Sequence, residues 1–207
     1  NLIVLGWRGA TSTARRILGE VTDHVVNHAV TDVVLVKFGR DARPIKRILL
    51  PTAGGLHATR AESYTALIAR SLDAEVTLCS VLPPDAEVVE AERAAERLGI
   101  VAEHLQHPLV PDGRPGTEAP EGENPEEAAA RANGGDPLRV NTRILRNASV
   151  ADAIVEAAPD YDAVVIGAAG QSFSTQVLFG AIPEEVARRT DRTVIVVKYH
   201  QPVRALL

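Results

Sequence analysis

The feature that most restricts how this chain can fold is an internal repeat. Residues 3–37 align without a gap with residues 164–198, which lie 161 positions further along. Each segment begins with an apolar run ending in glycine and closes with an apolar run ending in Val-Lys, at Lys37 and at Lys198. The chain therefore contains one module twice. Since the first copy corresponds only to the last third of the second, we expect the chain to begin inside a domain.

Composition restricts the classes of function. The net charge of -5 and the sequence pI of about 5.7 argue against a nucleic-acid partner, which requires clustered Lys and Arg on one face. Cys79 is the only cysteine, so no intrachain disulfide or cysteine zinc site can form, and a reducing compartment is favoured. No apolar run approaches the roughly 20 residues that span a bilayer, and the first residues lack a signal-peptide layout. We expect a cytoplasmic protein or a cytoplasmic module of a longer membrane protein.

Short apolar runs alternate with amphipathic patterns between residues 47 and 198. The predicted strands cover residues 47–52, 75–82, 140–145, 162–166 and 193–197. The predicted helices cover residues 58–72, 88–98 and 183–189, with a fourth that Asn147 or Ser149 caps and that runs to Ala158. Runs this apolar indicate a parallel sheet with helices on both faces. We predict an α/β fold with flavodoxin-like layers, in which ligands lie where the strand order reverses.

The domain organisation follows from the repeat and from a change in composition. Residues 1–38 are interpreted as the C-terminal third of a first domain, residues 39–46 as a linker and residues 47–201 as a complete second domain. Residues 108–137 are rich in Pro, Gly and Glu and have almost no large apolar side chains. Such a segment cannot bury enough surface to offset the entropy of ordering it. We interpret it as a flexible acidic insertion, with or without a docking role.

A glycine loop connects the fourth predicted strand to the last helix. Its pattern is Gly167-x-x-Gly170-x9-Gly180, and the first copy repeats it at Gly6, Gly9 and Gly19. Glycines at such a loop let backbone amides approach phosphate oxygens, and the helix N-terminus adds a partial positive charge. The alternative is that the glycines only make the turn and allow close helix packing. Both readings stay open at this point.

With these loops, strands and Val-Lys endings, the chain resembles the universal stress protein family over nearly everything except the insertion. The resemblance implies a five-stranded parallel sheet of the adenine nucleotide alpha hydrolase type and an AMP or ATP ligand, with no metal site. It places ligand contacts on these residues: Thr52, Ala53, Gly54, Gly55, Val81, Gly167, Gly170, Gln171, Ser172, Gly180 and Ala181.

The chain departs from the pattern of the nucleotide-binding members at two anchors. Ala181 stands where those members have Ser or Thr, and Glu20 stands there in the first copy. Ala53 stands where they have an acidic residue. Each lost hydrogen bond to a charged group costs on the order of 1.5 to 3 kcal/mol. We therefore expect weak or vestigial nucleotide binding, located mainly in the second copy.

Three functions are weighed, none of them enzymatic. The Pro51–Gly55 turn resembles that of universal stress domains fused to amino acid permeases, which suggests a regulatory cytoplasmic module with an upstream transmembrane portion. The alternatives are a free-standing tandem universal stress protein that binds ATP and a structural dimerisation domain without a ligand. In each case we expect the last strands, residues 31–37 and 193–197, to pair, either within one chain or across a homodimer. The flank of Ile3 to Leu5 is then open to partner contacts.

Four further residues are candidates for chemistry. His24 and His28 are four residues apart on a predicted helix, where they are either a metal-binding pair or a solvent-facing pair. We expect the latter, since no third ligand is evident. Cys79 lies in an apolar strand and is expected to be a core residue rather than a nucleophile. Trp7 is expected to pack against the protein rather than against a base.

Overall fold

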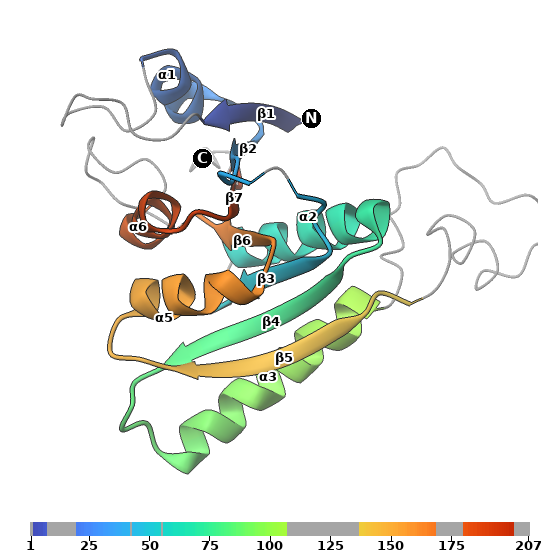
Figure 1. Ribbon diagram of the computed structural model, residues 1–207, viewed down its shortest axis with the longest axis vertical. Coiled ribbons are helices and arrows are strands. Elements are labelled where there is room, and N and C mark those ends of the chain that lie inside the picture. Colours follow the sequence, from blue (N-terminus) through green and yellow to red (C-terminus); the bar gives the residue numbers. More distant parts are fainter. Residues whose placement is uncertain are drawn as a thin grey trace, which may run out of the picture.

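The computed structural model describes residues 2–7, 20–41, 43–54, 56–106, 137–168 and 180–200. They form one mixed sheet of seven strands in the order β1-β2-β7-β6-β3-β4-β5 (Figure 1). The strands are β1 (Leu2–Trp7), β2 (Asp32–Lys37), β3 (Arg47–Pro51), β4 (Glu75–Leu82), β5 (Val140–Arg146), β6 (Ala163–Gly167) and β7 (Thr193–Lys198). The helices are α1 (Glu20–His28), α2 (Leu56–Leu72), α3 (Val88–Gln106), α5 (Val150–Ala157), the 3-10 helix η1 (Ala158–Asp160) and α6 (Ala181–Arg189).

The five strands from β7 to β5 all run parallel, which confirms the predicted five-stranded parallel sheet. The sheet nevertheless continues for two more strands, because β2 pairs antiparallel with β7 and β1 pairs parallel with β2. The apolar β7 is therefore not an edge strand of this sheet. The helix expected over residues 88–98 extends to Gln106, and the last helix begins at Ala181, which leaves Pro183 in its first turn as predicted.

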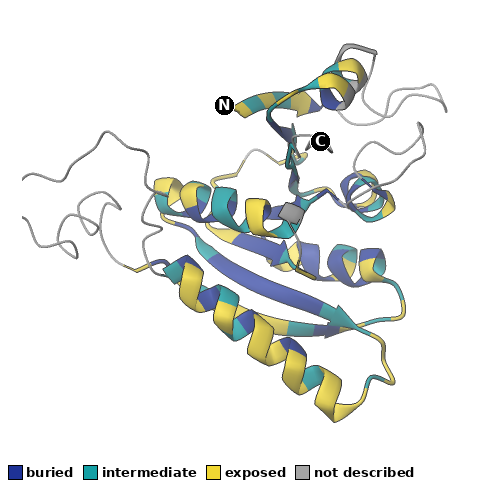
Figure 2. Ribbon diagram, turned by 180° about the vertical axis from the view of Figure 1, so that it is seen from behind, coloured by how far each residue is buried: buried dark blue, intermediate teal, exposed yellow. Residues whose placement is uncertain are grey.

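Helices cover both faces of the sheet and enclose two hydrophobic cores. One core lies beneath α2 and α3, and the other lies beneath α1, α5 and α6. Figure 2 shows the buried middle of the sheet lying between helices whose outer faces are exposed. Strand β3 contributes to both cores, and its residues Ile48, Leu49 and Leu50 are fully buried. Burial of each such side chain contributes about 1.5–3 kcal/mol. Ser149 caps α5 by accepting a hydrogen bond from the amide of Asp152 at 3.2 Å, which confirms one of the two expected caps.

The sequence repeat is also a structural repeat. The elements β1, α1 and β2 recur as β6, α6 and β7, and the bounds of both α1 and β2 are displaced by 161 residues. In the β2–β7 register, Leu35 lies opposite Val196, its own repeat equivalent. Val33 lies opposite Lys198 and Lys37 lies opposite Val194, so the two halves of the pairing are related by a pseudo-two-fold axis. We call this pairing, residues 33–37 with residues 194–198, the seam.

Candidate functional site

The candidate site lies at the carboxyl ends of β3 and β6. From β3 the chain moves outward through β4 to β5, and it then returns to place β6 on the other side of β3. The strand order therefore reverses between β3 and β6, and in open α/β sheets the ligand crevice lies outside such a point. The residues that leave the sheet there are Thr52 after β3 and Ala168 after β6. The predicted ligand site therefore lies at the carboxyl ends of two adjacent strands, and we call this place the rim.

Thr52 is held in place by three hydrogen bonds. Its amide donates to the carbonyl of Cys79 at 2.9 Å, and its hydroxyl donates to Glu62 Oε1 on α2 at 2.8 Å. The same hydroxyl oxygen accepts a longer bond of 3.4 Å from the amide of Gly54. Gly54 has a φ of 84°, a left-handed conformation that favours glycine. These contacts fix the Thr52–Gly54 loop, in which Ala53 and Gly54 are exposed.

Among the described residues, Glu62 is a member of the site that the sequence did not predict. It is half-buried and lies on the second turn of α2, ten residues after the threonine that it binds. It brings a carboxylate to the base of the loop in which Ala53 replaces an acidic residue. A helix pattern shows which residues share a face, but not that one of them contacts the loop before the helix, so the sequence carried no signal for this contact.

The N-terminus of α6 supplies backbone donors. The preceding Gly180 is buried with a φ of 97° and a ψ of 152°, and no side chain among the described residues caps the helix. Pro183 lacks an N–H, so Ala181 and Ile182 carry the N–H groups at the start of the first turn. Uncapped amides and the helix dipole favour an anion at this end. Glu184 places a negative charge in the same turn, which opposes this attraction.

Of the other predicted ligand contacts, some lie in the part of the chain that the structure describes and some lie outside it. Gly167 ends β6 and is half-buried beside the buried Val197 of β7. Val81 lies on β4, one strand beyond β3, where it packs half-buried against the core beneath α5 and α6. Ala181 is exposed. Gly55, Gly170, Gln171 and Ser172 fall outside the described residues.

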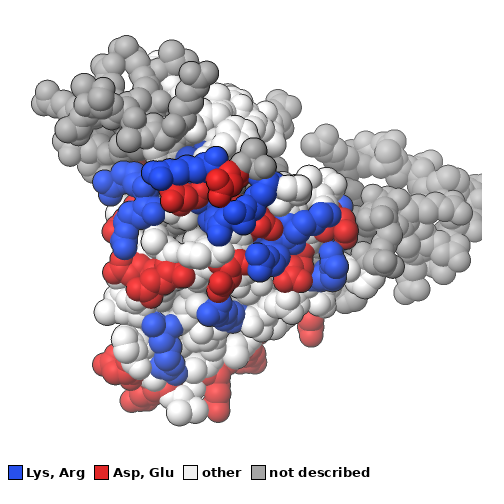
Figure 3. Space-filling view, viewed as in Figure 1, with Lys and Arg blue, Asp and Glu red and all other residues white. Residues whose placement is uncertain are grey.

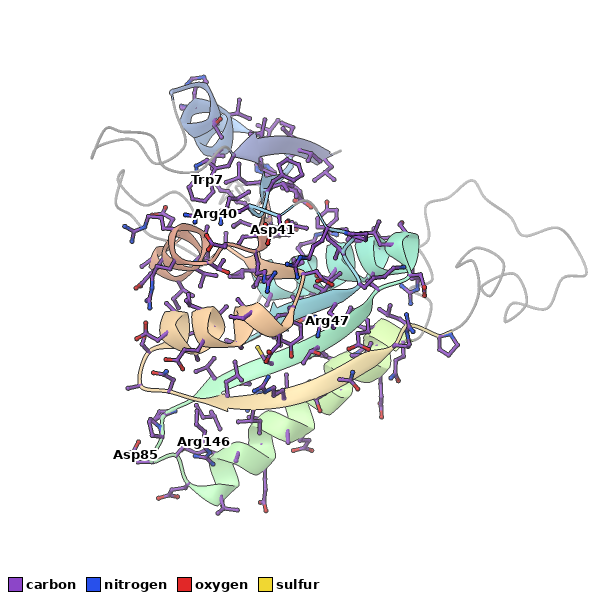
Figure 4. All side chains as sticks on the ribbon, in the orientation of Figure 1. Trp7, Arg40, Asp41, Arg47, Asp85 and Arg146 are labelled. Carbon is purple, nitrogen blue, oxygen red and sulfur yellow. The ribbon has the colours of Figure 1, made fainter. Side chains whose placement is uncertain are left out.

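The equivalent position in the first copy is filled by an indole. Trp7 is the repeat equivalent of Ala168, and it is only 5% exposed at the end of β1 (Figure 4). It belongs to the same core as Val26 of α1 and Leu35 of β2, as expected for a packing role. Its Nε1 is the one buried side-chain donor without a hydrogen-bond partner in the described part of the chain. The two copies therefore differ at this position.

The remaining candidates take no part in the rim. His28 Nδ1 lies 2.8 Å from the carbonyl of His24, the two rings stack at 4.2 Å, and both side chains are exposed. Cys79 is fully buried, and burial raises the pKa of its thiol to about 12, which confirms a core role. Among the described residues, no three His, Cys, Asp or Glu side chains are grouped so that they could hold a metal ion. On the face seen in Figure 3, acidic and basic side chains are interspersed rather than gathered into a basic stripe.

Comparison with known proteins assigns the family. The profile of the universal stress protein family matches residues 1–37 and 44–198, so the chain belongs to that family. No curated protein sequence matches it.

Several solved structures have the same fold. A universal stress protein from Archaeoglobus fulgidus DSM 4304 shares 19% identity with a TM-score of 0.59, over 97% of this chain and 61% of that one. A universal stress protein in complex with cAMP shares 19% identity with a TM-score of 0.51, over 77% of this chain and 100% of that one. A Pseudomonas aeruginosa UCBPP-PA14 protein of the same type shares 16% identity, with a TM-score of 0.51, over 96% of this chain and 63% of that one. The chain thus spans less than two thirds of the first and third of these relatives.

Proposed function

We propose that the second copy binds an adenine nucleotide, AMP or ATP, weakly at the rim between β3 and β6 and acts as a ligand-sensing regulatory domain rather than an enzyme. The observation that carries this proposal is that the adjacent strands β3 and β6, at the strand-order reversal, lead to two elements that can contact a nucleotide. These are the ordered Thr52–Gly54 loop and the α6 N-terminus, for which the described residues provide no side-chain cap. A structural relative with the same fold was solved in complex with cAMP, which supports the same ligand class here.

The weakness of binding follows from the groups at the rim. The amides of Ala181 and Ile182 can donate to a phosphate, but Ala181 offers no hydroxyl and Glu184 repels the charge. Ala53 offers no carboxylate to a nucleoside hydroxyl or amine. Losing contacts of this kind weakens affinity by about tenfold or more for each one. The first copy is the poorer site, because a buried Trp7 replaces Ala168 in it.

Calorimetric titration with AMP and ATP tests the proposal. We expect measurable heat at millimolar nucleotide from the wild-type chain and about tenfold tighter binding from Ala181→Ser, which restores a hydroxyl at the helix start. The matched control is Ala95→Ser, which adds the same hydroxyl at an exposed position of α3 and should leave the affinity unchanged. Absence of heat from both the wild type and Ala181→Ser at millimolar nucleotide would reject nucleotide sensing at this rim.

Two other proposals concern a structural role of the domain and its attachment to another protein. A structural role without a ligand is supported by the seam, which joins the two copies through β2 and β7. Attachment to an amino acid transporter at the cytoplasmic face rests only on the resemblance of the Pro51–Gly55 turn, and none of the relatives named above is described as a transporter. In the described part of the chain, no helix is long and apolar enough to cross a membrane.

A further inference from the structure

A carboxylate is held in a fixed position at the rim. Glu62 Oε1 accepts a hydrogen bond of 2.8 Å from the hydroxyl of Thr52, and the amide of Gly54 donates to that hydroxyl oxygen at 3.4 Å. This chain of hydrogen bonds holds the Glu62 side chain against the loop that leaves β3. Because the carboxylate is already ordered, a ligand that binds it does not have to order it, and such preorganisation favours binding.

The second oxygen of this carboxylate is available to a ligand. Glu62 is half-buried, and no group in the described part of the chain forms a hydrogen bond or an ion pair with its Oε2. An ionised carboxylate has about four acceptor positions, so most of this capacity is unused. Holding Thr52 requires one acceptor only, which an uncharged glutamine would also provide. A purely structural role therefore does not account for the charge of Glu62.

The loop beside the carboxylate leaves room for a ligand. A Cβ built on Gly54 meets no atom within 4 Å, and the neighbouring Ala53 is exposed with a small side chain. Since the amide of Gly54 binds the same hydroxyl oxygen as Glu62 does through Thr52, this open space adjoins the carboxylate. A ligand at the rim can thus approach Glu62 over the loop.

The chemistry of a carboxylate selects the part of a nucleotide that it can bind. An ionised carboxylate only accepts hydrogen bonds, so it repels a phosphate and favours a group that presents donors. The two hydroxyls of a ribose are adjacent donors. The adenine amine is a donor too, but the acceptor nitrogen N7 lies beside it and would face the carboxylate. The ribose diol is the better match, and an acidic residue binds the ribose in dinucleotide-binding α/β folds as well.

We propose that Glu62 binds the 2′- and 3′-hydroxyls of the ribose, so that the rim prefers ribonucleotides to nucleotides that lack these hydroxyls. This inference rests on the proposed binding of an adenine nucleotide at the rim. The helix α2, which carries Glu62, and the helix α6 cover opposite faces of the sheet (Figure 1). The nucleoside then lies on the α2 side of the rim. Its phosphate lies toward the amides of Ala181 and Ile182, away from the carboxylate.

Titration of the full chain with AMP and with 2′,3′-dideoxy-AMP tests this assignment, with NMR as the readout because weak binding is expected. The wild type should bind AMP about tenfold more tightly than the dideoxy analogue, the effect of losing a hydrogen bond to a charged group. In Glu62→Gln the preference should fall to about threefold, because a hydrogen bond to an uncharged acceptor is roughly half as strong. The glutamine keeps an acceptor for Thr52. Glu62→Ala removes both oxygens and should show no preference.

Two control variants separate recognition of the ribose from other effects. Glu103→Gln removes the same charge from an exposed position near the end of α3 and should keep the full preference for AMP. Ala181→Ser acts at the phosphate and should tighten the binding of both nucleotides equally. If the wild type shows no preference, or if Glu62→Gln and Glu62→Ala keep that of the wild type, the assignment of Glu62 is overturned while nucleotide binding stands. If neither the wild type nor Ala181→Ser binds AMP at millimolar concentration, the proposed function fails and the assignment fails with it.

Discussion

The carboxylate of Asp32 accepts a hydrogen bond of 2.9 Å from the backbone N–H of His200. The repeat gives the same contact with the roles of the copies exchanged, because the N–H of Gly39 donates to Thr193 Oγ1 at 3.1 Å. Thr193 is the equivalent of Asp32, and His200 is the equivalent of Gly39. The seam is therefore closed at both ends by equivalent bonds. In each copy, the first side chain of the last strand binds the backbone just beyond the last strand of the other copy.

Asp32→Asn should destabilise the fold by about 1.5–3 kcal/mol, the usual effect of losing hydrogen bonds to a charged group. The side chain of Asp32 is 11% exposed, and its Oδ2 accepts from the Tyr64 phenol at 2.9 Å and lies 3.6 Å from Arg60 Nε. The asparagine keeps the shape but loses the charge. Urea unfolding measures the change. Tyr64→Phe removes only the phenol bond, and the double variant should cost less than the sum of the two single changes. Strict additivity would mean that Asp32 and Tyr64 do not act together.

Gly39→Ala should also destabilise the fold, by about 1–3 kcal/mol, because the seam has no space for a Cβ at this position. It would lie 2.8 Å from the carbonyl oxygen of Asp191 and 3.0 Å from the amide nitrogen of Thr193, both of which are backbone atoms. Gly99→Ala is the control, since a Cβ on this α3 glycine meets nothing within 4 Å. It should stabilise the helix by about 1 kcal/mol. Equal effects of the two substitutions in thermal unfolding would contradict this account of the seam.

The sequence predicted those parts of the fold that depend on local periodicity. The five parallel strands, the Ser149 cap and the first-turn Pro183 follow from short-range patterns of apolar, capping and proline residues. The position of β2 does not follow in this way. The repeat shows that β2 and β7 are equivalent, but it does not decide whether they pair within one chain or between two. Contacts such as the bond from His200 to Asp32 join residues 168 positions apart, and no local pattern encodes them.

For the candidate site, the sequence predicted the place of the rim but not the side-chain contacts around it. The rim follows from the alternating pattern of strands and helices, and the structure places Thr52 directly after β3 and Gly167 at the end of the adjacent strand β6. The contact between Thr52 and Glu62 depends on the angle at which α2 leaves the loop, which packing decides. The burial of Trp7 depends in the same way on how α1 packs against β1 and β2.

Two of the three lysines should titrate below the ordinary value of 10.5. Burial lowers the pKa of Lys198, and burial followed by Arg40 lowers that of Lys37, although Asp191 acts in the opposite direction. Each ammonium crosses the seam: Lys198 donates to the carbonyl of Val26 at 2.6 Å, and Lys37 donates to that of Thr190. Between the lowered pKa and 10.5 the unfolded chain binds more protons than the folded chain, so these two groups add stability as the pH rises through that window.

Lysine side-chain NMR measures these titrations directly, because the chain has only Lys37, Lys46 and Lys198. Replacing each lysine by arginine assigns the three signals. A Lys198 signal that titrates at or above 10.5 would contradict burial of its ammonium at the seam.

Cys79 should not react with a thiol reagent in the native protein. It is fully buried on β4, and burial raises the pKa of its thiol to about 12, so little thiolate forms near neutral pH. Labelling should appear only with unfolding and should follow the urea midpoint of the fold. A cysteine introduced at the exposed Ala95 of α3 is the positive control and should react at once. Fast labelling of wild-type Cys79 would mean that β4 opens locally.

Thr52→Val should weaken nucleotide binding at the proposed rim by about fivefold, the equivalent of one hydrogen bond of about 1 kcal/mol. Valine has nearly the same shape but no hydroxyl, so both the bond to Glu62 and the bond from the Gly54 amide are lost. The Thr52–Gly54 loop must then be ordered by the ligand, which costs affinity. Thr52→Ser keeps the hydroxyl and should bind AMP like the wild type in calorimetric titration. If Thr52→Val and Thr52→Ser bind AMP equally well, the Thr52 hydroxyl does not organise the loop for a ligand, whatever binds there.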